Sequence, residues 1–438
     1  MHKKLWVSIL FGSLGLVVGC GGGSSSSNSG GSSSNPTPPT SGAANALAIT
    51  IDGGPTATET GGSIYTNGVF ASATICAPGS SSNCVTVDHL LVDTGSMGLR
   101  VLESAISSLN LGAVNASNGS PAYNCVSFVD GSFLWGPVKG ATVTLGKETA
   151  NSVPIQVISS STANIPTSCS GNNLSEDENT QSSLGANGIL GVGLEPNDCG
   201  SACESGTTEA NPPDAYYTCA SLPCTPQFIS QANQVANPVV LFPTDNNGVI
   251  VELPKLSGSA PTVSGSLIFG IGTESNNQLS NSATVFTLVC DAFNTIFDGQ
   301  NLDVTYTPSN GCQGGSFIDS GSNGLFFPDS SIPVCSSSTP IGDLSSFYCP
   351  ASALSLSATN QDPNNTSTMK TTNFTVDNAL NLFTASGTDA AFSTLGGLNP
   401  PGFGFDWGVP FFYGVNVYSA IDGQKMPMGL QNGPWWAY

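Results

Sequence analysis

Two segments of the chain share one sequence frame, and each places an aspartate directly after an apolar run. The segments are Asp93-Thr94-Gly95-Ser96-Met97-Gly98-Leu99 and Asp319-Ser320-Gly321-Ser322-Asn323-Gly324-Leu325. An aspartate at the end of a buried strand is costly unless it is hydrogen-bonded or used. The repeat therefore predicts two related lobes that each supply one carboxyl group. Two carboxyls that meet between lobes share a proton and can perform acid–base chemistry.

Other catalytic chemistry has little support in the sequence. Only two histidines are present, and His2 lies in a segment that we expect to be removed. A Ser-His-Asp triad, a Cys-His pair or a histidine metal centre would each depend on His89 alone. The segment 270–272 lacks the third glycine and the following helical pattern of a phosphate-binding loop. We therefore expect neither a metal ion nor a cofactor.

Many short strands must position the two aspartates. Gly (52) and Pro (29) are scattered among the 438 residues, and no long apolar stripe has the helical period. Apolar runs bounded by Gly, Pro, Asn and Asp are typical of strands. The runs that we expect to be strands are residues 48–51, 85–92, 141–145, 153–158, 239–242, 249–253, 266–269 and 409–417. The fold is predicted to be all-β.

The N-terminus predicts export and a lipid anchor. A basic start is followed by an apolar run, 5–18, which is too short for an ordinary membrane span. The run leads to Leu16-Val17-Val18-Gly19-Cys20, which resembles a bacterial lipobox whose cysteine is lipidated. A plain secretory signal with a chance cysteine is the alternative. The Gly/Ser/Pro-rich residues 21–45 favour lipidation, because an anchored protein uses such a tether.

These features divide the chain into a signal peptide (1–20), a tether (21–45), an N-terminal β lobe (46–275) and a C-terminal β lobe (280–438). We expect the protein in the bacterial cell envelope, anchored in the outer membrane at its periplasmic face or at the cell surface. The net charge of −21 argues against nucleic acid and against electrostatic docking on anionic lipid. The expected partner is a peptide or protein substrate, and the expected state is a monomer.

Cysteine usage also fits an oxidising compartment. Setting Cys20 aside leaves an even number of the 13 cysteines. Cys76 and Cys84 would close a short loop before the first aspartate motif. The cysteines at 290, 312, 335 and 349 flank the second motif, and those at 199, 203, 219 and 224 crowd one insertion, which leaves 125 and 169. A zinc site in that insertion is the alternative, but no C-x-x-C and no nearby histidine support it.

The paired Asp-(Thr/Ser)-Gly-Ser motifs resemble the catalytic loops of the pepsin-like aspartic peptidases. In that family a later hydrophobic–hydrophobic–Gly strand passes through each loop. Residues 188–193 (GILGVG) and 405–412 (FDWGVPFF) are similar to these strands. Residues 417–422 are similar to the family's closing strand, and 265–270 to the segment that joins its lobes. The resemblance implies the bilobal pepsin-like fold from about residue 46 onward.

The resemblance also implies a mechanism. Asp93 and Asp319 would face each other, share one proton and titrate as a pair. The ionised member would take a proton from a water that attacks a peptide carbonyl, while the protonated member polarises that carbonyl. The serines of the two motifs would bond the outer carboxylate oxygens, and the glycines would allow a close backbone approach. The supporting residues are Thr94, Gly95, Ser96, Ser320, Gly321 and Ser322.

The sequence departs from the family at the flap, a hairpin that carries a tyrosine. The best alignment places it at 128–132, with Phe128 in the tyrosine position and Gly131 in the turn. Tyr123 or Trp135 are the alternatives for the missing polar group.

Arg100 stands where the family often has tryptophan, Asp406 interrupts the second hydrophobic strand, and a basic pro-segment is lacking. Three interpretations therefore compete. They are an active aspartic endopeptidase, a catalytically weak or inactive peptide-binding lipoprotein on the same fold, and a structural envelope lipoprotein.

Overall fold

The computed structural model describes residues 43–55, 64–128, 131–161, 164–171, 177–206, 211–220, 222–307, 311–385, 387–399, 402–427 and 429–438. The expected signal peptide with Cys20, most of the expected tether, and residues 129–130 of the expected flap lie outside these ranges. The lipid anchor and the envelope location therefore stay predictions.

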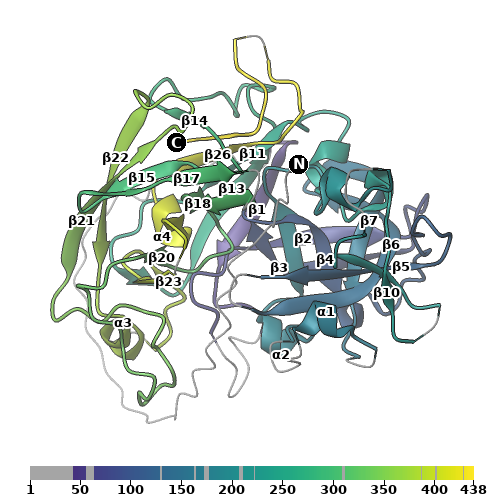
Figure 1. The fold of residues 1–438 in the computed structure, drawn as a ribbon, viewed down its shortest axis with the longest axis horizontal. Helices are drawn as coiled ribbons and strands as arrows, with labels where there is room; N and C mark the ends of the chain where they lie inside the picture. Colours follow the sequence, from purple (N-terminus) through teal and green to yellow (C-terminus); the bar gives the residue numbers. More distant parts are fainter. Residues whose placement is uncertain are drawn as a thin grey trace.

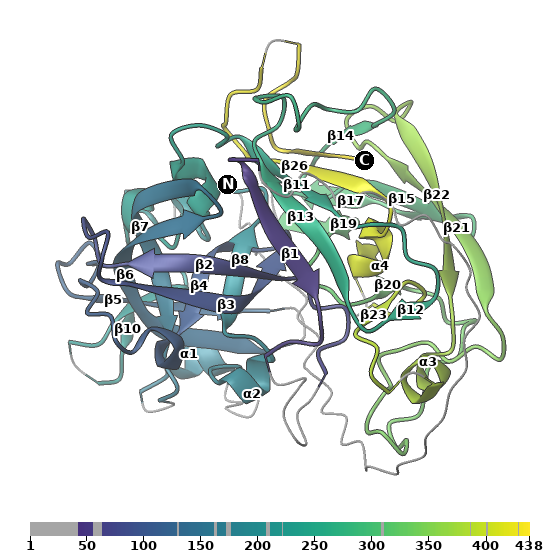
Figure 2. The ribbon, with the colours of Figure 1, turned by 180° about the vertical axis from the view of Figure 1, so that it is seen from behind.

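The described chain is dominated by short strands that form two lobes side by side, which confirms the all-β bilobal prediction (Figures 1 and 2). Its helices are short. The α-helices are α1 (Thr167–Ser170), α2 (Gln181–Leu184), α3 (Ala379–Ala385) and α4 (Val409–Phe412). The 3₁₀ helices are η1 (Glu103–Ile106), η3 (Gly200–Cys203), η4 (Gln231–Asn233) and η5 (Pro238–Leu241). No helix in this part of the chain is both long and apolar enough to cross a membrane.

A closed barrel of six strands forms the N-terminal lobe. The sheet order is β6-β7-β4-β8-β3-β2, and pairing of β6 with β2 closes it. The strands are β2 (Phe70–Cys76), β3 (Cys84–Asp93), β4 (Met97–Leu102), β6 (Phe133–Leu145), β7 (Glu148–Ile158) and β8 (Gly188–Val192). Closure leaves no unpaired edge between these strands. Three outer strands, β5 (Ala122–Ser127), β9 (Tyr216–Thr218) and β10 (Thr225–Pro226), extend the sheet from β6.

One antiparallel run of strands joins the two halves of the chain. Its order is β1-β13-β11-β26-β27-β14, so β11 from the expected N-terminal lobe pairs with β26 from the expected C-terminal lobe. The strands are β1 (Ala46–Ile51), β11 (Gly248–Glu252), β13 (Val263–Phe269), β14 (Val285–Thr287), β26 (Asn416–Ala420) and β27 (Trp435–Ala437). The expected lobe-joining segment 265–270 lies mostly in β13. Because both halves share this sheet, the residue boundaries of the lobes stay a prediction.

Smaller sheets build the C-terminal lobe. The larger two have the orders β16-β15-β21-β22 and β19-β25-β20-β24, and β12–β23 and β17–β18 are two-stranded. Their strands are β12 (Ser259–Ala260), β15 (Asn294–Phe297), β16 (Gln300–Leu302), β17 (Val304–Thr307), β18 (Gly311–Gly314), β19 (Phe317–Ile318), β20 (Leu325–Phe327), β21 (Leu354–Gln361), β22 (Met369–Val376), β23 (Ala391–Phe392), β24 (Gly396–Leu398) and β25 (Asp406–Trp407). Packed rings of Phe297, Phe327, Phe374, Phe405 and Trp407 fill the space between them.

Two of the expected strands are wrong in part. Residues 239–242 fall mostly in η5, where Pro238 occupies the first turn and the Asn237 side chain caps the amide of Val239 at 3.1 Å. Residues 409–412 form α4, with Pro410 in its first turn, and β26 begins only at Asn416. Proline fits the first turn of a helix because its missing N–H is not needed there.

Six disulfides tie the loops together in the part of the chain that the structure describes. The predicted bond between Cys76 and Cys84 is confirmed. The others are Cys125–Cys169, Cys199–Cys203, Cys219–Cys224, Cys290–Cys312 and Cys335–Cys349.

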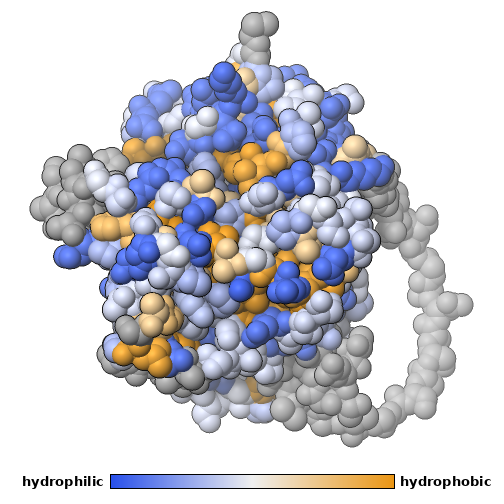
Figure 3. Space-filling model, turned by 90° about the vertical axis from the view of Figure 1, so that its right-hand side faces the viewer, coloured by the Kyte–Doolittle hydropathy of each residue, from blue (hydrophilic) through white to orange (hydrophobic). Residues whose placement is uncertain are grey.

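On the face in Figure 3, apolar side chains form separate patches among polar ones.

Candidate active site

The two aspartate motifs are built in the same way in the two lobes. Asp93 ends β3, which runs parallel to β8 with Asp93 opposite Gly191, and β4 returns antiparallel on the other side of β8. In the C-terminal lobe, β19 leads into Asp319 and runs parallel to β25, while β20 returns antiparallel to it. The later strand therefore lies between the two arms of each aspartate loop, as the resemblance predicts.

The glycine of each later strand is required by close backbone contact. A Cβ atom on Gly191 would lie 2.7 Å from the carbonyl carbon of Met97. One on Gly408 would lie 2.1 Å from the carbonyl oxygen of Gly324. Any larger residue would push the aspartate loop away from the strand that holds it.

Both carboxyl groups are fully buried and held by their own loops. The amides of Gly95 and Ser96 donate to Oδ1 of Asp93 at 2.8 and 3.1 Å, and the Ser96 hydroxyl donates to Oδ2. In the other loop, the Gly321 amide donates to Oδ1 of Asp319 at 2.7 Å. Each aspartate is therefore oriented by the residues that follow it.

The matching hydroxyl in the second loop belongs to Ser322, which donates to Oδ2 of Asp319 at 2.9 Å. The two carboxyls also converge on one donor, because the Gly95 amide reaches Oδ1 of Asp319 at 3.1 Å as well. The structure thus brings Asp93 and Asp319 together between the lobes.

Reciprocal hydrogen bonds fasten the two loops to each other. The amide of Thr94 donates to Oγ of Ser320 at 3.1 Å, and the amide of Ser320 donates to Oγ1 of Thr94 at 2.9 Å. The hydroxyl of Ser320 then reaches across to the carbonyl of Val92 at 2.7 Å, and that of Thr94 to Ile318 at 3.4 Å. Each of these four bonds has a counterpart in the other loop, so the loops hold the two carboxyls fixed relative to each other.

Burial and neighbouring charge favour a proton on the pair. Burial raises the pKa of Asp319 well above its ordinary value, the negative charges of Asp93 and Asp406 raise it further, and a hydrogen bond with Asp93 adds to the effect. The Gly321 amide opposes the shift without reversing it. Two carboxyls this close cannot both ionise without a large penalty.

A third carboxyl, Asp406, belongs to the same region. It is fully buried in β25, and burial, followed by the charge of Asp93, raises its pKa well above the ordinary value. The nearby Ser322 hydroxyl acts in the opposite direction. In the sequence, Asp406 stands out only as an acid within the apolar run 405–412, and this interruption is the signal that marks it. Within the described residues, no three acidic, histidine or cysteine side chains are grouped to hold a metal ion.

The expected flap residues lie at the turn between β5 and β6. The Phe128 amide donates to the carbonyl of Ser132, and the Gly131 amide donates to that of Phe128. The Phe128 ring is 4% exposed and packs in a cluster with Tyr65 and Phe70. This side chain therefore belongs to the apolar interior of its lobe.

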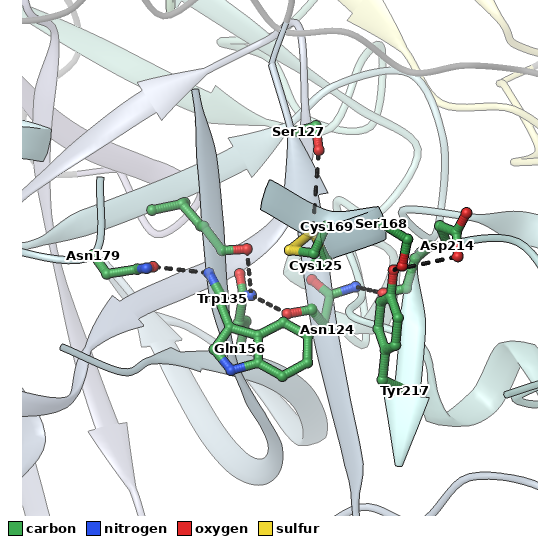
Figure 4. Close-up of a disulfide and its surroundings, with 12 residues drawn as sticks. Asn124, Cys125, Ser127, Trp135, Gln156, Ser168, Cys169, Asn179, Asp214 and Tyr217 are labelled. Carbon is green, nitrogen blue, oxygen red and sulfur yellow. Dashed lines mark hydrogen bonds between the residues drawn. A yellow bond between two sulfur atoms is a disulfide. The ribbon is translucent and has the colours of Figure 1, made fainter. Parts of the chain in front are cut away.

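Tyr123 and Trp135 are the two alternatives for the polar group that Phe128 lacks. Within the described residues, neither side chain forms a hydrogen bond to Asp93 or Asp319. Tyr123 and Trp135 stack on each other with ring centroids 5.5 Å apart. Figure 4 shows Trp135 close to the Cys125–Cys169 disulfide, where its backbone amide donates to the side-chain oxygen of Asn179 at 2.8 Å. Both rings pack in the apolar cluster around the Cys125–Cys169 disulfide.

Arg100 is the centre of a buried polar network. Its guanidinium donates to Asn124 at 2.5 Å, to Gln156 at 2.7 Å and to Asp198 at 3.0 Å. The Tyr216 hydroxyl also donates to Asp198. Burial raises the pKa of Asp198, although the charge of Arg100 opposes this. The network joins β4, β5, β7 and the η3 region, so Arg100 has a structural role.

Comparison with known proteins gives three findings. A family model described as "Protein of unknown function (DUF3443)" matches residues 41–438. No curated protein sequence matches the chain. Among solved structures, the chain is similar to the aspartic proteinase from Irpex lacteus, with a TM-score of 0.45 and 15% sequence identity over 86% of this chain and 93% of that one.

Proposed function

The chain belongs to the DUF3443 family, and we propose that it is an aspartic endopeptidase that hydrolyses peptide bonds with Asp93 and Asp319. The observation that carries the proposal is the convergence of these two buried carboxyls on the Gly95 amide, at 2.8 and 3.1 Å. A purely structural contact between lobes has no need of two buried acids, because buried carboxyls without a cation are costly.

The geometry supports distinct roles for the two carboxyls. The raised pKa of Asp319 supports the assignment of the shared proton to its carboxyl in the free enzyme. Asp93 would then act as the base that removes a proton from the attacking water. The proton on Asp319 would pass to, or polarise, the substrate carbonyl oxygen as the tetrahedral intermediate forms. Collapse of that intermediate transfers a proton to the leaving amine and returns the pair to its starting state.

Ser96, Ser322 and the two loop glycines would act by orientation. Their hydrogen bonds restrict each carboxyl to one rotation, so the acid and the base present their free oxygens to the same substrate position. Pre-orientation of this kind lowers the barrier because no reorganisation is needed during reaction.

Digestion of a peptide library from pH 2 to 8, with and without pepstatin, tests the activity. We expect cleavage that is strongest below neutral pH and is blocked by pepstatin, since rate is lost once both carboxyls ionise. A chain that cuts no peptide at any pH would remove this proposal.

A peptide-binding lipoprotein on the same fold is the second candidate. The burial of Phe128 favours this binding role. Phe128 stands where the pepsin-like aspartic peptidases have the flap tyrosine, and its side chain packs into the lobe interior. Calorimetric binding of pepstatin or peptides without cleavage would support this candidate, and absence of both would favour a structural envelope protein.

We also propose that the protein is tethered to the envelope through lipidated Cys20. The supporting feature is the lipobox-like sequence before a Gly/Ser-rich segment. Cys20→Ser should move the protein from the membrane fraction to the soluble fraction, because the variant lacks the thiol to which the lipid would be attached, and that lipid supplies the proposed attachment to the membrane. A Cys20→Ser protein that stays with the membrane would contradict the tether.

A further inference from the structure

Asp406 is a buried acid to which the mechanism proposed above assigns no role. It lies in β25 between Phe405 and Trp407, whose rings stack on each other with centroids 4.5 Å apart. Because side chains alternate along a strand, Asp406 faces away from this aromatic core. Its side chain is fully buried, and both carboxylate oxygens make no hydrogen bond within the described part of the chain. Such a group is costly as an anion.

Among the described residues, no ion pair includes Asp406, so its charge has no paired cation there. The strands on either side of β25 supply apolar residues, with Phe317 opposite Asp406 in β19 and Phe326 opposite it in β20. The ionisable groups that act on Asp406 and Asp319 are the carboxyls themselves, with Asp93 as the third member. Three buried carboxyls therefore share one region, and no ion pair within the described ranges supplies them with a counter-charge.

Ser322 connects Asp406 to the active pair. Its hydroxyl donates its single hydrogen to Oδ2 of Asp319 at 2.9 Å. The same hydroxyl lies near enough to Asp406 to lower the pKa of that carboxyl, against the larger opposing effect of burial. A hydroxyl has one hydrogen to give and two lone pairs to receive with. While the hydrogen points to Asp319, only a protonated Asp406 can bond favourably to the Ser322 oxygen.

We propose that Asp406 is a positioning residue for the active pair: its carboxyl stays protonated in the working enzyme and donates to Ser322 Oγ, which keeps the Ser322 hydroxyl directed at Asp319. This inference rests on the proposed peptidase function for its catalytic consequence. The three carboxyls then hold two protons when the enzyme is active, one on Asp406 and one shared by Asp93 and Asp319.

The proposal links ionisation of Asp406 to loss of activity. An ionised Asp406 attracts the Ser322 hydrogen, so Asp319 loses its outer hydrogen-bond donor. Raising the pH therefore removes both the shared proton of the pair and the proton that fixes Ser322. The alkaline side of the pH–activity profile should fall with a limiting slope of about −2 in log kcat per pH unit, where loss of a single proton gives about −1.

Two variants separate charge from hydrogen bonding. Asp406→Asn is neutral and keeps an N–H donor for Ser322, while Asp406→Leu is neutral and has no donor. We expect Asp406→Leu to have a kcat about tenfold below that of Asp406→Asn, in line with one lost hydrogen bond. The alkaline slope of Asp406→Asn should be about −1, since only the pair can then lose a proton. Equal kcat values for the two variants, or equal slopes for Asp406→Asn and wild type, would overturn the proposal.

Carbon-13 NMR of protein labelled at aspartate carboxyls gives a readout that does not need activity. At about pH 6, exposed aspartates are ionised, so any protonated carboxyl signals come from shifted groups. We expect Asp406→Asn to show one protonated carboxyl fewer than the wild type. Equal numbers in the two proteins would overturn the inference. If the protein cuts no peptide, the peptidase proposal fails, and this proton count still decides whether Asp406 is held neutral.

Discussion

Gly95 lies directly against the carboxyl group of Asp319 from the opposite lobe. Its amide donates to Oδ1 of Asp319 at 3.1 Å, and a Cβ atom on Gly95 would lie 2.6 Å from Cγ of that residue. Gly321 has the converse relationship with Asp93, because its Cβ would lie 2.7 Å from Oδ1. Each loop glycine is therefore a contact surface for the other loop's acid, and the pair exists only while both positions lack a side chain.

Gly95→Ala should displace the Asp319 carboxyl and lower kcat/KM by at least about 100-fold, the effect of an ångström-scale misplacement. Gly112→Ala is the matched control in the same lobe, since a Cβ there meets nothing within 4 Å. Steady-state kinetics with thermal unfolding of both variants checks the prediction. Similar kinetics for the two alanine variants would contradict the close approach of the loops.

Ser320 and Thr94 should act as one unit that fastens the lobes. Ser320→Ala removes a bond to Val92 and the acceptor for the Thr94 amide, so we expect the free energy of unfolding to fall by about 1–3 kcal/mol. Thr94→Ala should lose a similar amount, and the double variant should lose less than the sum. The control pair, Thr74 and Thr86, makes an exposed hydroxyl contact of 2.9 Å and should be nearly neutral. Denaturant titration of the wild type and these variants would reveal strict additivity if Ser320 and Thr94 were independent.

Stability should depend on pH through Asp319. Its pKa is raised in the folded protein, so the folded state retains a proton that the unfolded chain releases. Its contribution is therefore fully present below the ordinary aspartate pKa and is lost as pH rises toward the folded value. Asp319→Asn cannot ionise, so it should raise the melting temperature at neutral pH relative to wild type and flatten the fall above about pH 4. Melting curves of the two proteins that stay parallel from pH 3 to 7 would exclude the shift.

Phe128→Tyr tests the expected flap position. The ring is buried among apolar neighbours, so a hydroxyl added there should lower the free energy of unfolding by about 1–3 kcal/mol and leave turnover no higher than in wild type. Stability and kcat measured on the same preparation decide between the two roles. A rise in kcat would instead show that the residue reaches the substrate and that its missing hydroxyl limits activity.

The local parts of the site could be predicted from the sequence. Asp93, Asp319 and their glycines are adjacent in the chain, and the repeat of one frame shows that both loops have the same shape. The later strands could also be found, because Gly191 and Gly408 stand among apolar residues in the sequence. These features depend on short segments, and the conformation of each segment follows from residues that are adjacent in the chain.

The remaining parts depend on contacts between distant segments. Arg100 is explained only by partners such as Asn124 and Asp198, which three separate loops and strands deliver to one place. The role of Asp406 depends on the direction of one side chain beside Ser322, which an apolar pattern cannot report. The pairing of β11 with β26 likewise joins segments more than a hundred residues apart, as in the bond between Glu252 and Asn416.

The central claim is that Asp93 and Asp319 together hydrolyse peptide bonds. The most direct measurement is kcat/KM for the best library peptide at its optimum pH, in wild type and in Asp93→Asn and Asp319→Asn proteins whose melting shows that they are folded. We predict that each variant loses at least about 1,000-fold, because each leaves one acid without its partner. Cleavage at the wild-type rate by either folded variant would contradict the account.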